Sequence, residues 1–439
     1  MSVITPDTAL PVSARPARRD IGIKKRYAAE ARFKAYGVIA IVFGLSFLAI
    51  MLGSIVSKGY TAFWQTNVTL PVTFDATVLD PQNKRDSDPM VLVKANYDRL
   101  AQQALATKLG IAAADKARTR ELKGFISDSA RIQLRDMLVA DPALMGKTVD
   151  VSMLASANID SAFKGQVDLS VPEARRKVKD QQIVWMNQLA EEGVLAQKFN
   201  TGLFTFGASS RPETSGIGVA IVGSLYMMGI VLVLALAIGV AASIYLEEFA
   251  AKNRLTDLIE VNINNLAAVP SIVFGLLGLA VFINFLGMPR SAALVGGITL
   301  SLMTLPTIII ATRAALAAVP PSIRSAALAL GASRMQMVFH HVLPLAMPGI
   351  LTGTIIGLAR ALGETAPLLL IGMVAFVADY PSTPLDPSTA LPVQIYMWSN
   401  EAERAFVERM SGAIMILLAF LMTMNITAII LRRKFERRW

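Results

Sequence analysis

Arg360 and Glu364 are two ionisable side chains placed four residues apart inside an apolar run. The run from Pro348 to Ala375 predicts a membrane-spanning segment, and an ionised side chain at mid-bilayer costs roughly 2.5–3.5 kcal/mol even on a lenient insertion scale. Two hypotheses account for the pair. In the first, Arg360 presents its planar guanidinium to an oxyanion crossing the membrane, and Glu364 orients it or accepts a proton. In the second, the two side chains form a structural ion pair that fixes helix packing.

Four residues of this run share one stripe of a continuous helix, within an arc of roughly 60°: Gly353, Gly357, Arg360 and Glu364. Small residues let another helix approach closely, so we expect the stripe to face the interior of a helix bundle. A proline three residues after Glu364 is expected to loosen the helix and free a carbonyl near the pair. The candidate substrate-pathway residues are Arg360, Glu364 and Thr365, and the candidate packing residues are Gly353, Gly357 and Pro367.

The elements that must position these residues are membrane spans. Hydrophobic residues make up 54% of the 439 residues and charged residues only 17%, which is too apolar for a soluble protein of this length. The apolar residues gather into runs long enough to cross a bilayer. Six spans are predicted: Ala35–Val56, Ile217–Tyr245, Val269–Leu286, Ala292–Ile310, Pro348–Ala375 and Ala413–Leu431. The expected fold is therefore an all-α polytopic membrane protein with six transmembrane helices.

The polar stretch 57–215 separates the first span, 35–56, from the five spans within 216–431. Apolar residues alternate with polar ones from Val68 to Phe74, and Pro71 makes this an expected edge strand. Helical patterns follow at Lys94–Leu109 and Ser127–Val139, and a third, opened by a capping-box pattern, at Val171–Lys198. These patterns predict a small α+β domain inserted between the first two transmembrane helices, and we call residues 57–215 the inserted domain.

The orientation in the membrane is predicted from the Lys and Arg residues of the two tails, 1–34 and 432–439. An even number of spans places both tails on one side, and basic flanks mark that side as cytoplasmic. The inserted domain is then periplasmic in a bacterial inner membrane, and an amphipathic segment, Glu247–Asn265, lies along the inner membrane surface. The net charge of +10 reflects this topology. Contact with anionic membrane lipids is expected, but nucleic-acid binding is not, because the tails lack interleaved aromatic residues.

A second chemical signal lies in the predicted cytoplasmic loop 319–344. Ser325-Ala-Ala-Leu-Ala-Leu-Gly331 is followed by nine residues and then His341-Val-Leu-Pro344. This pattern predicts a short helix, a turn permitted by glycine and a second short helix ending at Pro344. It resembles the loop signature of ABC-type import permeases, which reads Glu-Ala-Ala, three residues, Gly, nine residues and Ile-x-Leu-Pro. The matching residues are Ala326, Ala327, Gly331, Leu343 and Pro344, whereas Ser325 replaces the Glu and His341 the Ile. The loop is either a docking knob for a partner protein or an ordinary connection, and the spacing favours docking.

The chain as a whole resembles the PstA-type permeases of phosphate ABC importers from Ser215 to Trp439, and in outline over the first span. The stretches that carry the resemblance are Ile217–Leu225, Ile244–Glu248, Asn265–Gly275 and above all Ala359–Pro367. The resemblance implies an ABC type I importer fold and an intramembrane arginine and acid at Arg360 and Glu364. It also implies a PstC-type permease as heterodimer partner, a PstB-type ATPase dimer and a PstS-type phosphate-binding protein. For the inserted domain it suggests no function.

Several other functions are disfavoured. The chain has no cysteine and only two, adjacent, histidines, so we predict no metal site and no catalytic residues. We predict no bound cofactor either, since ATP and Mg²⁺ belong to the partner ATPase. Three alternatives remain: a permease for another oxyanion such as sulfate or molybdate, a non-conducting phosphate-sensing scaffold, and a secondary transporter, which the docking loop disfavours.

Overall fold

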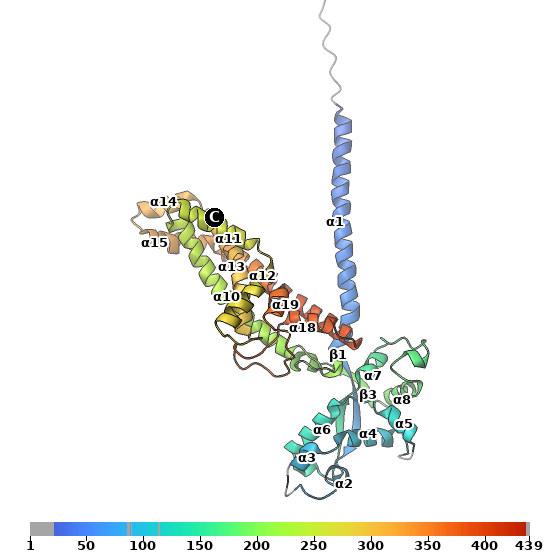
Figure 1. Cartoon of the computed structure of the whole chain (residues 1–439). Coiled ribbons are helices and arrows are strands. Elements are labelled where there is room, and N and C mark those ends of the chain that lie inside the picture. Colours follow the sequence, from blue (N-terminus) through green and yellow to red (C-terminus); the bar gives the residue numbers. More distant parts are fainter. Residues whose placement is uncertain (1–21, 86–87, 89, 113–114, 436–439) are drawn as a thin grey trace, which may run out of the picture. The chain divides into compact units, whose positions relative to one another are not determined.

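A computed structural model of the chain describes residues 22–435 apart from 86–87, 89 and 113–114 (Figure 1). The outer parts of both basic tails lie outside the described residues. The chain divides into two compact units, Met1–Ser54 and Ile55–Trp439. The described part of the first unit is a stretch of α1 (Ile23–Gly59), whose most apolar window contains no buried residue within that unit. A helix with such a long apolar window suits a lipid environment, and it contains the predicted first span.

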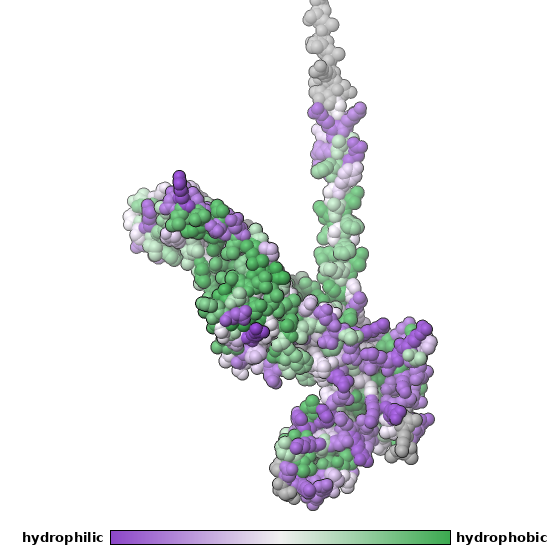
Figure 2. Space-filling model, viewed as in Figure 1, coloured by the Kyte–Doolittle hydropathy of each residue, from purple (hydrophilic) through white to green (hydrophobic). Residues whose placement is uncertain are grey.

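Within the described residues, five helices are long and apolar enough to cross a membrane. Besides α1 they comprise α10 (Gly218–Ile244), α13 (Ala293–Ala317), α16 (Leu343–Gly363) with the turns that precede it, and α19 (Ala405–Phe435). A sixth is possible as a bent pair, in which α11 (Arg254–Ala267) meets α12 (Ser271–Leu277) and η6 (Gly278–Phe285) at 104°. Figure 2 shows hydrophobic residues gathered over these core helices and hydrophilic ones over the inserted domain.

The packing of α10 against α13 shows that the bent pair contains a crossing. A Cβ on Gly297 would lie 2.7 Å from Ile230, and one on Gly239 would lie 2.8 Å from Ile308, so the two helices run parallel. The chain leaving the end of α10 must therefore return along the bundle before α13 begins. α12 and η6 make this return over about 22 Å. The predicted third span corresponds to them, and the amphipathic segment before it corresponds to α11.

The two ends of this bundle carry different connections. At one end, which we call the loop end, lie η5 (Tyr245–Phe249), α11, α14 (Pro321–Ala329) and α15 (Arg334–Met337). The opposite end, the domain end, contains the start of α10 and α18 (Leu391–Ser399), and the Leu391 N–H donates to Ser224 Oγ over 2.9 Å. The inserted domain joins the core at the domain end, where Trp398 Nε1 of α18 donates to Ser215 Oγ over 3.2 Å.

The inserted domain is α+β. A three-stranded antiparallel sheet, ordered β2-β1-β3, consists of β1 (Trp64–Thr73), β2 (Thr148–Leu154) and β3 (Leu195–Phe199). Its main helices are α4 (Tyr97–Lys108), α6 (Ser129–Ala140), α7 (Ala157–Phe163) and α8 (Asp180–Glu191). Shorter elements are η1 (Tyr60–Phe63), α2 (Ala76–Leu79), α3 (Met90–Lys94), α5 (Lys116–Leu122), η2 (Pro142–Leu144), η3 (Glu173–Arg175), α9 (Gly202–Thr205) and η4 (Pro212–Thr214).

Two predictions for this domain were wrong. β1 is the central strand rather than an edge strand, because it pairs with β2 on one side and with β3 on the other. β3 pairs only with Trp64–Val68, so Pro71 has no neighbour on that side. The missing N–H of Pro71 therefore breaks no ladder bond. The predicted helix Val171–Lys198 is also shorter. Its capping-box pattern opens only η3, and the helix α8 that follows leads through Gly193, which has a φ of +69°, into β3.

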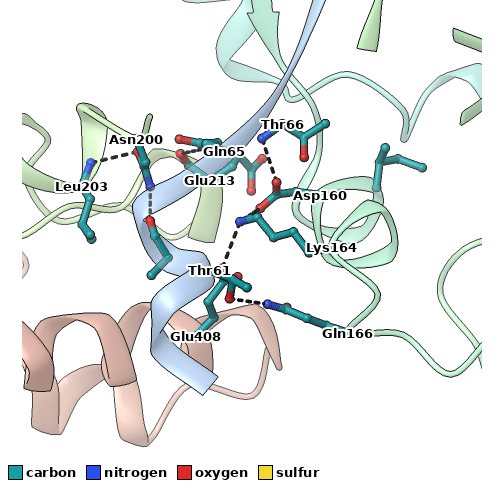
Figure 3. Close-up of polar contacts among 12 residues, drawn as sticks. Thr61, Gln65, Thr66, Asp160, Lys164, Gln166, Asn200, Leu203, Glu213 and Glu408 are labelled. Carbon is teal, nitrogen blue, oxygen red and sulfur yellow. Dashed lines mark hydrogen bonds and ion pairs between the residues drawn. The ribbon is translucent and has the colours of Figure 1, made fainter. Parts of the chain in front are cut away.

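A buried charge cluster joins the inserted domain to α19 (Figure 3). Lys164 Nζ lies 2.6 Å from Asp160 Oδ2 and 2.9 Å from Glu408 Oε1, and its side chain is only 2% exposed. The other carboxylate oxygen of Asp160 accepts the N–H of Thr66 over 2.8 Å. Because an unpaired buried charge is costly, these contacts hold α7 and the first turn of α19 together.

Candidate translocation and coupling sites

α16 packs closely on α13 through glycines. A Cβ on Gly353 would lie 2.2 Å from the Cβ of Ala311, which is closer than real side chains approach. Gly357 is less tightly enclosed, since its Cβ would lie 3.4 Å from Ile308 and 3.9 Å from Thr304. The contact with Thr304, near the midpoint of α13, places this part of α16 in the middle of the bundle. These two glycines thus lie at the interface between α16 and α13.

Arg360 follows one turn after Gly357, and its side chain is 45% exposed in the single chain. We expected the whole stripe to face the bundle interior, but only the small residues do so. The side chain of Arg360 instead reaches the surface of the bundle, since nearly half of it is exposed. A positive charge thus stands at mid-bundle, on a face that this chain does not cover.

Glu364 does not belong to the helix that carries Arg360, contrary to the predicted continuous span Pro348–Ala375. α16 ends at Gly363, Glu364 is extended with a ψ of 127°, and α17 (Ala366–Leu370) begins after Thr365. Pro367 lies in the first turn of α17, where it needs no N–H partner. Its ring would clash with the carbonyl four residues back, at Gly363, so the helix stops there instead of merely loosening.

The break leaves the charged pair only loosely joined. Arg360 Nε lies 3.8 Å from Glu364 Oε1, beyond hydrogen-bond distance, and the Glu364 side chain is 23% exposed. Gly275 of α12 supports the break, since a Cβ there would lie 2.7 Å from Cα of the buried Pro367. Thr365 uses its carbonyl to accept the N–H of Leu369 over 3.1 Å. The guanidinium therefore retains donors for a further anionic partner.

The loop motif forms a compact knob at the loop end. Gly331 has a φ of +84°, a conformation that favours glycine, and it separates α14 from α15. Ala327 is buried with Val338 and Leu316 in a cluster at the base of the core helices, whereas Ser325 and Ala326 are exposed. Four large apolar side chains of the knob are exposed to solvent, and Leu330 is the most exposed at 90%: Leu328, Leu330, Met335 and Phe339.

The second short helix does not end at Pro344 as predicted. α15 continues through the π-helical turn η7 (Val338–Val342) into α16, so Leu343 and Pro344 lie in the first turn of α16. Pro344 has no N–H to give to the carbonyl of His340, and the wider π-helical turn accommodates this defect. The fifth span accordingly begins at Arg334 rather than Pro348 and continues for 30 residues to Gly363.

Ion pairs that no sequence pattern indicated hold the elements of the loop end together. Arg324 Nη2 lies 2.7 Å from Glu248 Oε1, and the same guanidinium donates to the carbonyls of Leu316 and Val319. Arg313 joins Glu247 at 3.3 Å and Glu260 at 2.7 Å, which links α13 to η5 and α11. Charges flanking the apolar runs were a visible signal. No sequence pattern, however, indicates which of these charges pair with one another across 53 to 76 residues.

Comparisons with known proteins find relatives among membrane transport proteins. Residues 235–439 match the family described as "Binding-protein-dependent transport system inner membrane component", and residues 20–173 match a "Domain of unknown function (DUF3333)". The phosphate transport system permease protein PstA 1 of Mycobacterium tuberculosis is 32% identical over 258 residues, covering 58% of this chain and 77% of that protein. The probable ABC transporter permease protein YqgH of Bacillus subtilis is 31% identical, covering 55% and 80%.

Among solved structures, the inward-facing MetNI methionine ABC transporter matches with a TM-score of 0.40 and 18% identity, over 50% of this chain and 97% of that one. The multi-pass helical core and the match to the transport family define a membrane permease subunit of the ABC type. Within that class, the chain belongs to the PstA-type family of phosphate transport system permeases.

Proposed function

We propose that this chain forms half of the translocation pathway of an ATP-driven importer of inorganic phosphate. The observation that carries the proposal is the exposed Arg360 at mid-bundle, beside the break at Glu364. Lipid cannot cover a guanidinium there without a cost of several kcal/mol. A planar fork of N–H donors matches the oxygens of phosphate. The similarity to PstA 1 of Mycobacterium tuberculosis, which is named a phosphate transport system permease, supports phosphate over other oxyanions.

The uncovered face of α16 supports a second permease subunit as partner. Covering it with a PstC-type chain would place Arg360 at the boundary of the two subunits, where a water-filled path can open. In this arrangement Glu364 and Thr365 line the same path, and Gly353, Gly357 and Pro367 set how closely the supporting helices approach. A PstS-type binding protein would deliver phosphate, and most of the anion specificity lies in that protein.

The knob at the loop end supports coupling to a PstB-type ATPase. Exposed apolar side chains clustered on a compact, polar-rimmed element mark a protein interface, and Leu330 is the most exposed of them. Arg324 of α14 fixes the knob to η5 and to the end of α13, so a displacement of α14 would be transmitted to the spans. ATP and Mg²⁺ are then bound by the ATPase, and this chain performs no chemistry of its own.

Both termini and the loop end are cytoplasmic in this proposal, and the inserted domain is periplasmic. Basic residues just beyond the last span support it. Because the chain has no cysteine, single cysteines can report the orientation. A membrane-impermeant maleimide should label Lys123→Cys in intact cells and Ser322→Cys only after permeabilisation. Labelling in the reverse order would invert the topology.

Reconstitution with the three presumed partners tests the transport function. Proteoliposomes should take up ³²P-phosphate only with ATP, and an excess of unlabelled phosphate should block uptake. Equal inhibition by sulfate or molybdate would favour the alternative oxyanions. Phosphate-dependent ATP hydrolysis without any uptake would favour the non-conducting scaffold, and uptake without the ATPase would favour a secondary transporter.

A further inference from the structure

A cleft of about 1040 Å³ lies between the inserted domain and the start of α19. Its walls come from the end of α1, from α7 and the segment around η3, and from the turn that leads into α19. Every lining residue belongs to the second unit. Pockets that hold small molecules or cofactors have volumes of about 300–1,000 Å³. The cleft is therefore large enough for a phosphorylated small molecule or for the headgroup of a phospholipid.

The charges that line this cleft are unequal in number. Six basic side chains and three acidic ones face it. Glu408 is bound to Lys164 in the buried cluster of Figure 3, and Glu403 lies 3.6 Å from Lys177. The third acid, Asp168, accepts hydrogen bonds from the Ser170 hydroxyl and backbone N–H, which lower its pKa, so it stays charged at neutral pH. The lining thus holds three more basic than acidic side chains, and two acids outside it, Asp160 and Asp180, pair with Lys164 and Arg176.

Three of the basic residues are exposed and have no ion-pair partner among the described residues: Lys58, Arg175 and Arg404. They come from the last turn of α1, from η3 and from the turn before α19, so three separate segments bring positive charge to one cleft. A cleft in which charges of one sign predominate attracts counter-ions of the other sign.

A fourth basic residue supplies an unsatisfied donor. The Arg176 side chain lines the cleft and is only 8% exposed. Its guanidinium pairs with Asp180, yet its Nε has no hydrogen-bond partner within the described part of the chain. A buried donor without a partner costs about 1–3 kcal/mol, and an oxyanion bound in the cleft would bring acceptor oxygens close to it.

We propose that this cleft binds a phosphate-bearing anion through Arg175, Arg404 and Lys58. Two sources share this chemistry, namely free inorganic phosphate and the headgroup of an anionic phospholipid. The cleft adjoins the ends of two apolar helices, α1 and α19, and the exposed Val407 forms part of its lining. The acyl chains of a lipid would have apolar surface beside them. The site is distinct from Arg360, and binding there needs no transport.

The test uses the purified full-length chain with two probes. Equilibrium dialysis measures ³²P-phosphate binding, and native mass spectrometry measures phosphatidylglycerol retained after delipidation, with phosphatidylcholine as the neutral comparison. In Arg175→Gln/Arg404→Gln, binding of whichever probe binds to the wild type should fall at least roughly tenfold, because two charge-assisted contacts are lost. The matched control Arg99→Gln/Arg131→Gln removes two exposed arginines of the inserted domain outside the cleft and should bind within about twofold of wild type.

Binding of phosphate without phosphatidylglycerol identifies the free anion, and the reverse identifies the lipid. The proposal is wrong if the chain binds no phosphate in dialysis and retains no more phosphatidylglycerol than phosphatidylcholine. It is also wrong if the two double variants lose binding equally. Should Arg175→Gln/Arg404→Gln lower the unfolding temperature, Lys58→Gln replaces it as the test, with Lys123→Gln as its control. Uptake through Arg360 is measured separately, so failure of either proposal leaves the other standing.

Discussion

Arg360→Gln should lower the initial rate of ATP-driven phosphate uptake by roughly a hundredfold or more, while the permease complex still assembles. The substitution removes the positive charge and the bidentate donor pair, and each hydrogen bond to a charged group contributes about 1.5–3 kcal/mol. Assembly should persist because Arg360 makes no hydrogen bond to Glu364 and, in the proposed arrangement, faces the water-filled path rather than a packed contact. The measurements are ³²P uptake in proteoliposomes and co-purification of the partner subunits.

Three further variants make this experiment decisive. Arg360→Lys keeps the charge but loses the planar fork, so an intermediate rate is expected. Glu364→Gln should leave assembly intact, because the 3.8 Å contact is too long to be a structural bond. Arg290→Gln removes an exposed arginine from a connection at the domain end and serves as the matched control. Unchanged uptake in Arg360→Gln would exclude a conducting role, and loss of the complex would favour the structural ion pair.

Leu330→Glu should weaken association with the ATPase roughly ten- to a hundredfold and reduce uptake in parallel. Burying a leucine side chain contributes about 1.5–3 kcal/mol, and a charge in the same place adds a desolvation cost. Leu330 is 90% exposed, so its replacement should leave the unfolding temperature unchanged. The dissociation constant of the ATPase and coupled ATP hydrolysis are the quantities to measure.

Leu385→Glu provides the control for this variant, because Leu385 is also exposed but belongs to the connection between α17 and α18. It should bind the ATPase as the wild type does. Gly331→Ala tests the turn itself, since a side chain at a φ of +84° costs about 1–2 kcal/mol and should distort the knob. If Leu330→Glu binds the ATPase normally and transports normally, the knob is an ordinary connection between spans.

Features that depend only on residues adjacent in the sequence could be predicted from the sequence. Apolar runs located the long spans, because a helix needs about 20 apolar residues to cross the bilayer, whatever its neighbours. Spacing around Gly331 located the knob, since a helix, a left-handed turn and a second helix depend on local backbone preferences. Arg360 stood out for the same reason, as its charge is anomalous in any apolar run.

Features that depend on distant partners could not be predicted in this way. Pro71 indicated an edge strand, yet whether its missing N–H matters depends on where β3 ends. Glu364 was assigned to the helix of Arg360, whereas the helix breaks at Gly363 and packs Pro367 against Gly275. Arg324 gave no sign that its partner is Glu248, 76 residues away.

The sequence alone determined that the chain has several membrane-spanning helices, that a loop between them has the spacing of the ABC permease signature and that an arginine lies inside an apolar run. Those properties follow from hydrophobic length, glycine placement and the cost of an ion in hydrocarbon. Only the tertiary structure decided that Arg360 and Glu364 lie on either side of a helix break, and that Lys58, Arg175 and Arg404 line one cleft. The reason is that packing brings together segments whose separation along the chain carries no periodic signal.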